Sequence, residues 1–167
     1  IQNTTFINCS AASNGGSIAV TSAGGTTLLS NVTISYSKAG LRGGAILIVS
    51  STVKIFDSWI SSNTALEGGG IYAVGTFVNR AQISLTNVNI SQNLAVESMR
   101  RPGDSPDWSG SGGGIVIDGV NSELVISGTS ALVGNRALWL GGCILARSGA
   151  SVTLLDSAII SENRVVF

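Results

Sequence analysis

The side chains that could do acid–base chemistry in this chain are nine carboxylates, because histidine is absent. Hydrolysis of a glycosidic bond needs two carboxyl groups that face each other across the substrate, and no two acids here recur at a spacing that brings them together. We therefore predict no catalytic residue, no metal ligand and no cofactor, and hence no enzyme. The nine acids are Asp57, Glu67, Glu97, Asp104, Asp107, Asp118, Glu123, Asp156 and Glu162.

Asp57 and Asp156 are the two acids that share a position in a repeating pattern. Each follows a predicted strand, roughly in line with Asn31 and Asn87. A short Asp or Asn side chain at a corner usually bonds nearby backbone groups. We interpret this column as structural, with catalysis as the less favoured alternative.

The segment 96–111 carries the residues that could bind a ligand. It contains both prolines of the chain and lengthens one repeat, so we expect a protruding loop. Arginine beside tryptophan suits recognition of sugars or proteins, while the alternative is a loop that packs on itself. The candidate binding residues are Arg100, Arg101, Asp104, Asp107 and Trp108.

Four Asn-x-Ser/Thr sequences could accept N-linked glycans if the chain is secreted by a eukaryote. They lie at Asn3, Asn8, Asn31 and Asn89. The repeat register described below points Asn8 and Asn89 outward and puts Asn3 and Asn31 near a corner, so Asn8 and Asn89 are the stronger candidates.

The composition excludes several classes of function. Only 11% of the residues are charged, less than half of the roughly 25% usual in soluble domains, and 44% are hydrophobic, which argues against disorder. The net charge is zero, so nothing electrostatic favours nucleic acid as a partner. The apolar runs at 45–49 and 158–160 are too short to cross a bilayer, and we predict no membrane span.

Two independent motifs reveal an internal repeat. The first is Gly-Gly-x-Ile or its variant Gly-Gly-Gly-Ile, and its copies are Gly15–Ile18, Gly43–Ile46, Gly68–Ile71, Gly112–Ile115 and Gly141–Ile144. The second is apolar-x-x-Asn-x-Ala, whose asparagine position falls at residues 9, 37, 63, 93, 135 and 163, in steps of 28, 26, 30, 42 and 28. Both motifs have a period near 28 and show their long step in the same interval.

Each period contains two short runs with the apolar/polar alternation of β-strands and no helical periodicity. This pattern predicts an all-β parallel β-helix, or β-solenoid, of about five to six coils in one domain, 1–167. Equivalent residues then stack about 4.8 Å apart. The glycine pairs either supply a positive φ or allow close backbone approach.

The stacking predicts an inward ladder of amide side chains at one corner, which would bond turn backbone groups that water cannot reach. Its members are Asn63, Asn93, Asn135 and Asn163. Cys9 and Cys143 lie about four coils apart, roughly 19 Å, whereas a disulfide joins Cα atoms within about 7 Å. We therefore expect two free, buried thiols.

Gly-Gly-Ala-Ile at Gly43–Ile46, with apolar-x-x-Asn-x-Ala upstream, resembles the repeats of chlamydial polymorphic outer membrane proteins. Similar repeats occur in other right-handed parallel β-helix (pectin-lyase-like) surface proteins, and the resemblance covers the chain except residues 96–111. It implies a right-handed parallel β-helix exposed at a cell surface. Lyases of this fold typically cluster acids, often around calcium, with a basic residue on one outer face. The fold hosts lyases, hydrolases, adhesins and ice-binding proteins, so it implies no single activity.

We expect a non-enzymatic extracellular or cell-surface module, structural or adhesive, that belongs to a surface fibre or filament. Neither end shows a cap, although solenoids need caps, so the expected partners are further solenoid coils or copies of the chain, joined end to end, together with glycans. The alternative is a carbohydrate-binding or carbohydrate-active domain that uses the outer face near 96–111, which acids and aromatics converging on one groove would favour. A third alternative, ice binding, needs regular threonine columns that the sequence lacks.

Overall fold

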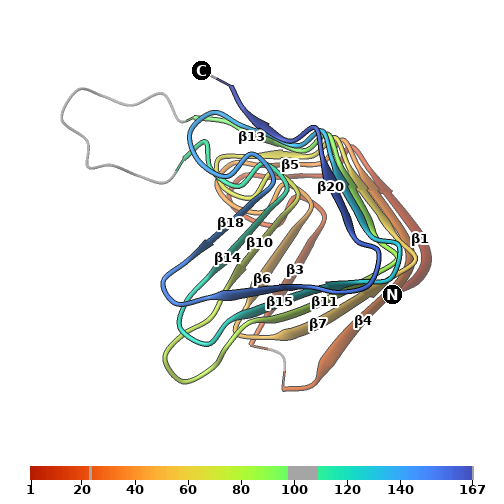
Figure 1. Ribbon diagram of the computed structural model, residues 1–167, viewed down its shortest axis with the longest axis vertical. Coiled ribbons are helices and arrows are strands. Elements are labelled where there is room, and N and C mark those ends of the chain that lie inside the picture. The colour runs from red at the N-terminus through yellow and green to blue at the C-terminus, as the bar shows by residue number, and fades with distance from the viewer. Residues whose placement is uncertain (23, 98–108, 167) are drawn as a thin grey trace.

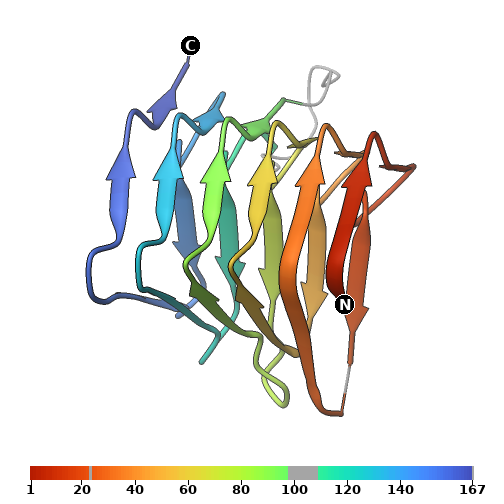
Figure 2. The same ribbon diagram turned by 90° about the vertical axis from the view of Figure 1, so that its right-hand side faces the viewer.

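The chain folds as a parallel β-solenoid of about five turns, spaced about 28 residues apart. The computed structural model describes residues 1–22, 24–97 and 109–166, and all the regular secondary structure in them is β-strand. The coils lie side by side along the axis (Figure 2). Seen along that axis, the chain turns anticlockwise as it advances toward the viewer, which makes the solenoid right-handed (Figure 1). The predicted fold class is confirmed.

Three parallel sheets form the walls of the solenoid. The first has the order β18-β14-β10-β6-β3, with β3 Ile18–Thr21, β6 Ile46–Val49, β10 Ile71–Val74, β14 Ile115–Asp118 and β18 Ile144–Arg147. The third has the order β2-β5-β9-β13-β17-β21, with β2 Ser10–Ala11, β5 Lys38–Ala39, β9 Thr64–Ala65, β13 Leu94–Ala95, β17 Arg136–Ala137 and β21 Arg164–Val165.

The second sheet bends around a corner and supplies two walls. Its strands are β1 Gln2–Ile7, β4 Thr26–Ser35, β7 Thr52–Phe56, β8 Trp59–Ser61, β11 Gln82–Thr86, β12 Asn89–Ser91, β15 Glu123–Ser127, β16 Ala131–Val133, β19 Ser151–Leu154 and β20 Ile159–Ser161. Strand β4 joins the two walls because its first half pairs with β7 and its second half with β8.

The repeat motifs set the register of the sheets. The isoleucines of the glycine motif stack as one column, since Ile18, Ile46, Ile71, Ile115 and Ile144 are successive strand partners. Their side chains point inward to a single core that runs the length of the solenoid. Each coil therefore buries its apolar residues against the coils before and after it.

The two glycines of each pair have different structural tasks. Gly43 bends the chain with φ at +64°, a conformation that a side chain disfavours. Gly44 lies where two coils touch: a Cβ atom there would overlap the carbonyl oxygen of Gly69 and lie 2.7 Å from the backbone nitrogen of Thr64. The pair thus uses both properties of glycine that the sequence suggests as alternatives, the positive φ at Gly43 and the close backbone approach at Gly44.

The four ladder asparagines lie at the corner between the second and third sheets. Asn93 and Asn135 are fully buried, and the Nδ2 group of Asn93 donates to the Oδ1 atom of Asn135 at 3.0 Å. The same Nδ2 group also donates to the carbonyl oxygen of Ile60 at 2.9 Å. Asn63 continues the ladder on one side and Asn163 on the other. Each amide therefore bonds its neighbours in the ladder and the backbone of the preceding coil.

Candidate functional site

The loop residues that the sequence singles out lie outside the described part of the chain. They are Arg100, Arg101, Asp104, Asp107 and Trp108. Along the chain, the segment 96–111 stands between β13 and β14.

The four possible glycan acceptors differ in exposure. Asn3, Asn8 and Asn31 are exposed. Asn89 is less exposed than these three, because it is half-buried and its Oδ1 atom is shielded from solvent. The Nδ2 group of Asn31 donates one of its two hydrogens to the Oδ1 atom of Asn3 at 2.9 Å. Asn8 thus has the most accessible side chain of the two stronger candidates.

Asp57 and Asp156 lie at a corner, as their alignment with asparagines suggests. Asp57 accepts a hydrogen bond from the Nδ2 group of Asn87 at 3.0 Å, and Asp156 accepts one from the backbone N–H of Gly128 at 2.9 Å. Both acids adopt a positive φ, which Asp tolerates better than most residues. These contacts give the two carboxylates a role in shaping the corner.

Two other acids do converge, contrary to the expectation from spacing. Arg147 binds Glu67 through Nη2 at 2.7 Å and Asp118 through Nε at 2.7 Å. The coils bring together residues 80 positions apart, and such proximity is invisible along the chain. The sequence contained a signal for one of these contacts. Asp118 and Arg147 each come three residues after the isoleucine of their glycine motif, and in the structure they are strand partners.

Tyr72 and Arg42 complete this cluster, which we name the Arg147 network. The hydroxyl group of Tyr72 donates to Asp118 at 3.3 Å and lies 3.1 Å from Nη2 of Arg147, which donates to it. Arg42 places its guanidinium group 4.9 Å from the centre of the Tyr72 ring and its Nε atom 3.4 Å from Glu67.

The network lies on the outer face of the first sheet, because its strand residues alternate with the inward isoleucines. Leu47, Tyr72 and Val116 form a buried apolar patch on that face, separate from the main core. Beside it, a pocket of about 280 Å³ is lined by Leu41, Arg42, Leu66, Glu67 and Ser109.

The environment of the network shifts the pKa values of Tyr72, Asp118 and Arg147 so that each side chain keeps its ordinary charge. Burial and the charge of Glu67 raise the pKa of Tyr72. Burial alone would raise the pKa of Asp118, but hydrogen bonds from Ser148 and Arg147 hold it below its usual value. Burial alone would lower the pKa of Arg147, but the hydrogen bond to Asp118 and the charge of Glu67 raise it. These three groups are therefore poorly suited to exchange protons near neutral pH.

Substituting Asp118 with asparagine is expected to make the free energy of unfolding depend less on pH in the acid range than it does in the wild type. Because the folded-state pKa of Asp118 lies below its ordinary value of 3.8, the carboxylate stabilises the fold above that value. This stabilisation disappears as the pH falls through the folded-state pKa. We expect D118N to be less stable than the wild type at pH 7 and to approach it at the acid end, as measured by urea unfolding between pH 7 and pH 2.

A matched control for D118N is E97Q, which removes an exposed carboxylate without a hydrogen bond to other described residues. E97Q should keep the wild-type dependence on pH. Parallel profiles for D118N and the wild type would contradict the assigned role of the network.

The two cysteines are free thiols. Both are half-buried rather than fully buried. Burial raises the pKa of Cys143 to about 12, so its thiol is poorly reactive at neutral pH.

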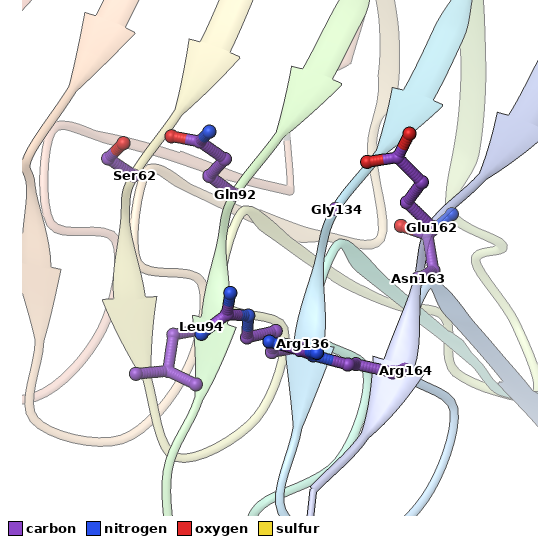
Figure 3. Close-up of a pocket in the computed structure, with 8 residues that line it drawn as sticks. All are labelled: Ser62, Gln92, Leu94, Gly134, Arg136, Glu162, Asn163 and Arg164. Atoms are coloured by element: carbon purple, nitrogen blue, oxygen red, sulfur yellow. The ribbon is translucent and has the colours of Figure 1, made fainter.

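A groove of about 830 Å³ lies at the corner that holds the asparagine ladder (Figure 3). Two rows of residues line it, and each row adds one residue per coil. One row contains Ser62, Gln92, Gly134 and Glu162, and the other contains Leu94, Arg136 and Arg164. The sequence does not single out this groove, although the steps of the asparagine motif place its residues in register.

Two classes of site receive no support in the described ranges. No group of three or more His, Cys, Asp or Glu side chains there is arranged to hold a metal ion. The same residues contain no helix with the length and apolar character needed to span a bilayer. No protein-family model, curated protein or solved structure matches the chain.

Proposed function

We propose that the chain is a structural and adhesive module of a surface fibre, joined end to end to further solenoid coils. The observation that carries this proposal is the apolar face of the last coil. Ile160 is 41% exposed, whereas its strand partner Leu132 is fully buried. Leu154 is 50% exposed beside its fully buried partner Ile126. Core columns thus continue to this face, and no described residue covers Ile160 or Leu154 fully.

The backbone supports the same proposal. Strands β18, β19, β20 and β21 each have one pairing neighbour in the described structure, so one edge of each strand is open. Open parallel edges next to exposed apolar side chains favour pairing with another strand. Another coil would supply both the missing hydrogen bonds and the apolar cover, whether it belongs to a longer chain or to a second copy.

The location at the outside of a cell is part of this proposal. The resemblance of the repeats to those of chlamydial and pectin-lyase-like surface proteins supports it, as does the exposed sequon at Asn8. A right-handed β-helix of this kind would display its loops and glycans on a rigid support.

Sedimentation velocity over a range of concentrations tests the end-to-end contact. We expect the chain to associate, and L154D to abolish association, because a buried charge in an apolar contact is strongly unfavourable. The control is W59D, since Trp59 is 51% exposed but lies on the side of the solenoid, on β8, which pairs with β4 and β12 on its two edges. A monomeric wild type, or equal effects of the two substitutions, would contradict the proposal.

A second candidate function is carbohydrate binding at the Arg147 network. The observation that favours it is the convergence of two acids, a tyrosine and two arginines beside a pocket on an outer face. The pKa directions favour binding over acid–base catalysis. In a glycan-array experiment, R42A should lose the signal, because Arg42 lines the pocket and is the more exposed arginine of the network. Unchanged binding by R42A would reject this site.

A further inference from the structure

The corner groove contains two like charges that lie side by side. Arg136 on β17 and Arg164 on β21 are strand partners, so their backbones are about 4.8 Å apart. Both side chains are exposed, and neither forms an ion pair with another described residue. Like charges directly opposite on neighbouring strands are unfavourable. An anion between them would turn this repulsion into two charge-assisted contacts.

The opposite row of the groove offers a different chemistry. Ser62, Gln92 and Glu162 contribute a hydroxyl, an amide and a carboxylate. All three residues adopt a positive φ, as does Gly134, so the same backbone bend recurs in each coil (Figure 3). Gly134 leaves the wall open, because a Cβ atom there would meet only the Cγ atom of Gln92, at 3.8 Å. Neutral and acidic polar groups of this kind suit the hydroxyl groups of a sugar.

We propose that this groove binds an acidic polysaccharide that lies along the solenoid axis. The rows run from coil to coil, so an extended ligand meets equivalent positions at regular intervals. The arginines would take its carboxylate groups, and the opposite row would take its hydroxyl groups. A nucleic acid fits less well, because the groove lining has no aromatic side chain on which a base could stack, and Glu162 would repel dense phosphates.

This site would give the proposed adhesive module its ligand, and it does not depend on end-to-end association. Titration calorimetry with alginate fragments, at protein concentrations below association, measures binding in the wild type and again in L154D. We expect binding in both, with dextran of equal length giving no heat. If the chain binds alginate but does not associate, only the end-to-end proposal is rejected. If the chain associates but does not bind alginate, only the proposed groove site is rejected.

Two groove variants test the roles of the charges. R136Q/R164Q should weaken alginate binding at least tenfold, since hydrogen bonds from arginine to a carboxylate are charge-assisted and stronger than neutral ones. E162Q should tighten binding by about twofold, because it removes a like charge near the ligand. A purely structural role for Glu162 would not produce tighter binding.

The control K54Q/R80Q removes two exposed positive charges away from the groove and should bind alginate as the wild type does. An equal loss in this control would show non-specific attraction and overturn the proposal. Unchanged binding by R136Q/R164Q would overturn it as well. Tighter binding of single-stranded DNA than of alginate would overturn the ligand class.

Discussion

Replacing Asn93 with alanine is expected to destabilise the solenoid by about 4 kcal/mol or more. The Oδ1 atom of Asn93 accepts from the backbone and side-chain nitrogens of Asn63, at 3.0 and 2.9 Å. Its Nδ2 group donates to Ile60 and Asn135. Alanine removes these four hydrogen bonds and takes the acceptor from the backbone N–H of Asn63, whereas the Oδ1 atom of Asn135 keeps the backbone N–H of residue 93 and the Nδ2 group of Asn63 keeps the carbonyl oxygen of Ile34. Each lost buried hydrogen bond costs about 0.5–1.5 kcal/mol, and a buried group left unsatisfied costs about 1–3 kcal/mol. Urea unfolding followed by circular dichroism measures the loss.

The control for N93A is N89A, a substitution of the same type in the same coil. Asn89 is half-buried, and its Oδ1 atom has no hydrogen-bond partner among the described residues. We expect its free energy of unfolding to change by less than about 0.5 kcal/mol. Similar losses for the two variants would show that the ladder contributes no special stability.

Replacing Gly44 with alanine is expected to separate two coils and to cost about 3 kcal/mol or more, if the variant folds at all. The new Cβ atom would overlap the carbonyl oxygen of Gly69 and approach the backbone nitrogen and carbonyl carbon of Thr64, at 2.7 and 2.8 Å. Backbone atoms on two sides cannot rotate away as a side chain can. The two coils could relieve this overlap only by breaking the hydrogen bonds between them at Gly44. The midpoint of urea unfolding measures this effect.

Gly25 is the matched position for this experiment. A Cβ atom there meets nothing within 4 Å. We expect G25A to be neutral, or more stable by about 0.4–1 kcal/mol, because alanine restricts the unfolded chain. If G44A and G25A unfolded at the same midpoint, close contact between coils at Gly44 would not be a constraint on the fold.

Much of the fold was predictable because a solenoid repeats the same backbone path and the same contacts in every coil. The positions of the glycine and asparagine motifs placed Ile71 beside Ile115, and Asn93 beside Asn135, even across the long step between them. Parallel stacking converts a period along the chain into a column in space. The absence of helix from the described residues followed from the same periodicity.

The candidate sites were less predictable, because they depend on neighbouring columns and on side-chain directions. Sequence spacing indicated that no acids converge, yet Glu67 and Asp118 share Arg147 on the outer face of the first sheet. Glu67 belongs to the glycine corner, whereas Asp118 and Arg147 end their strands. A repeat pattern aligns residues within a column, but it does not say which columns of the outer face lie within reach of a long side chain.

By itself, the sequence determined the coil, its period, its inward isoleucines and its asparagine ladder. These features depend on contacts between equivalent residues of adjacent coils, and the period alone specifies those contacts. Only the tertiary structure decided which columns meet, where Glu67 reaches Arg147 and where the row of Glu162 lies across the groove from the row of Arg136 and Arg164. Those sites depend on how the walls bend at each corner, and the bends bring together columns that have no common position in the repeat.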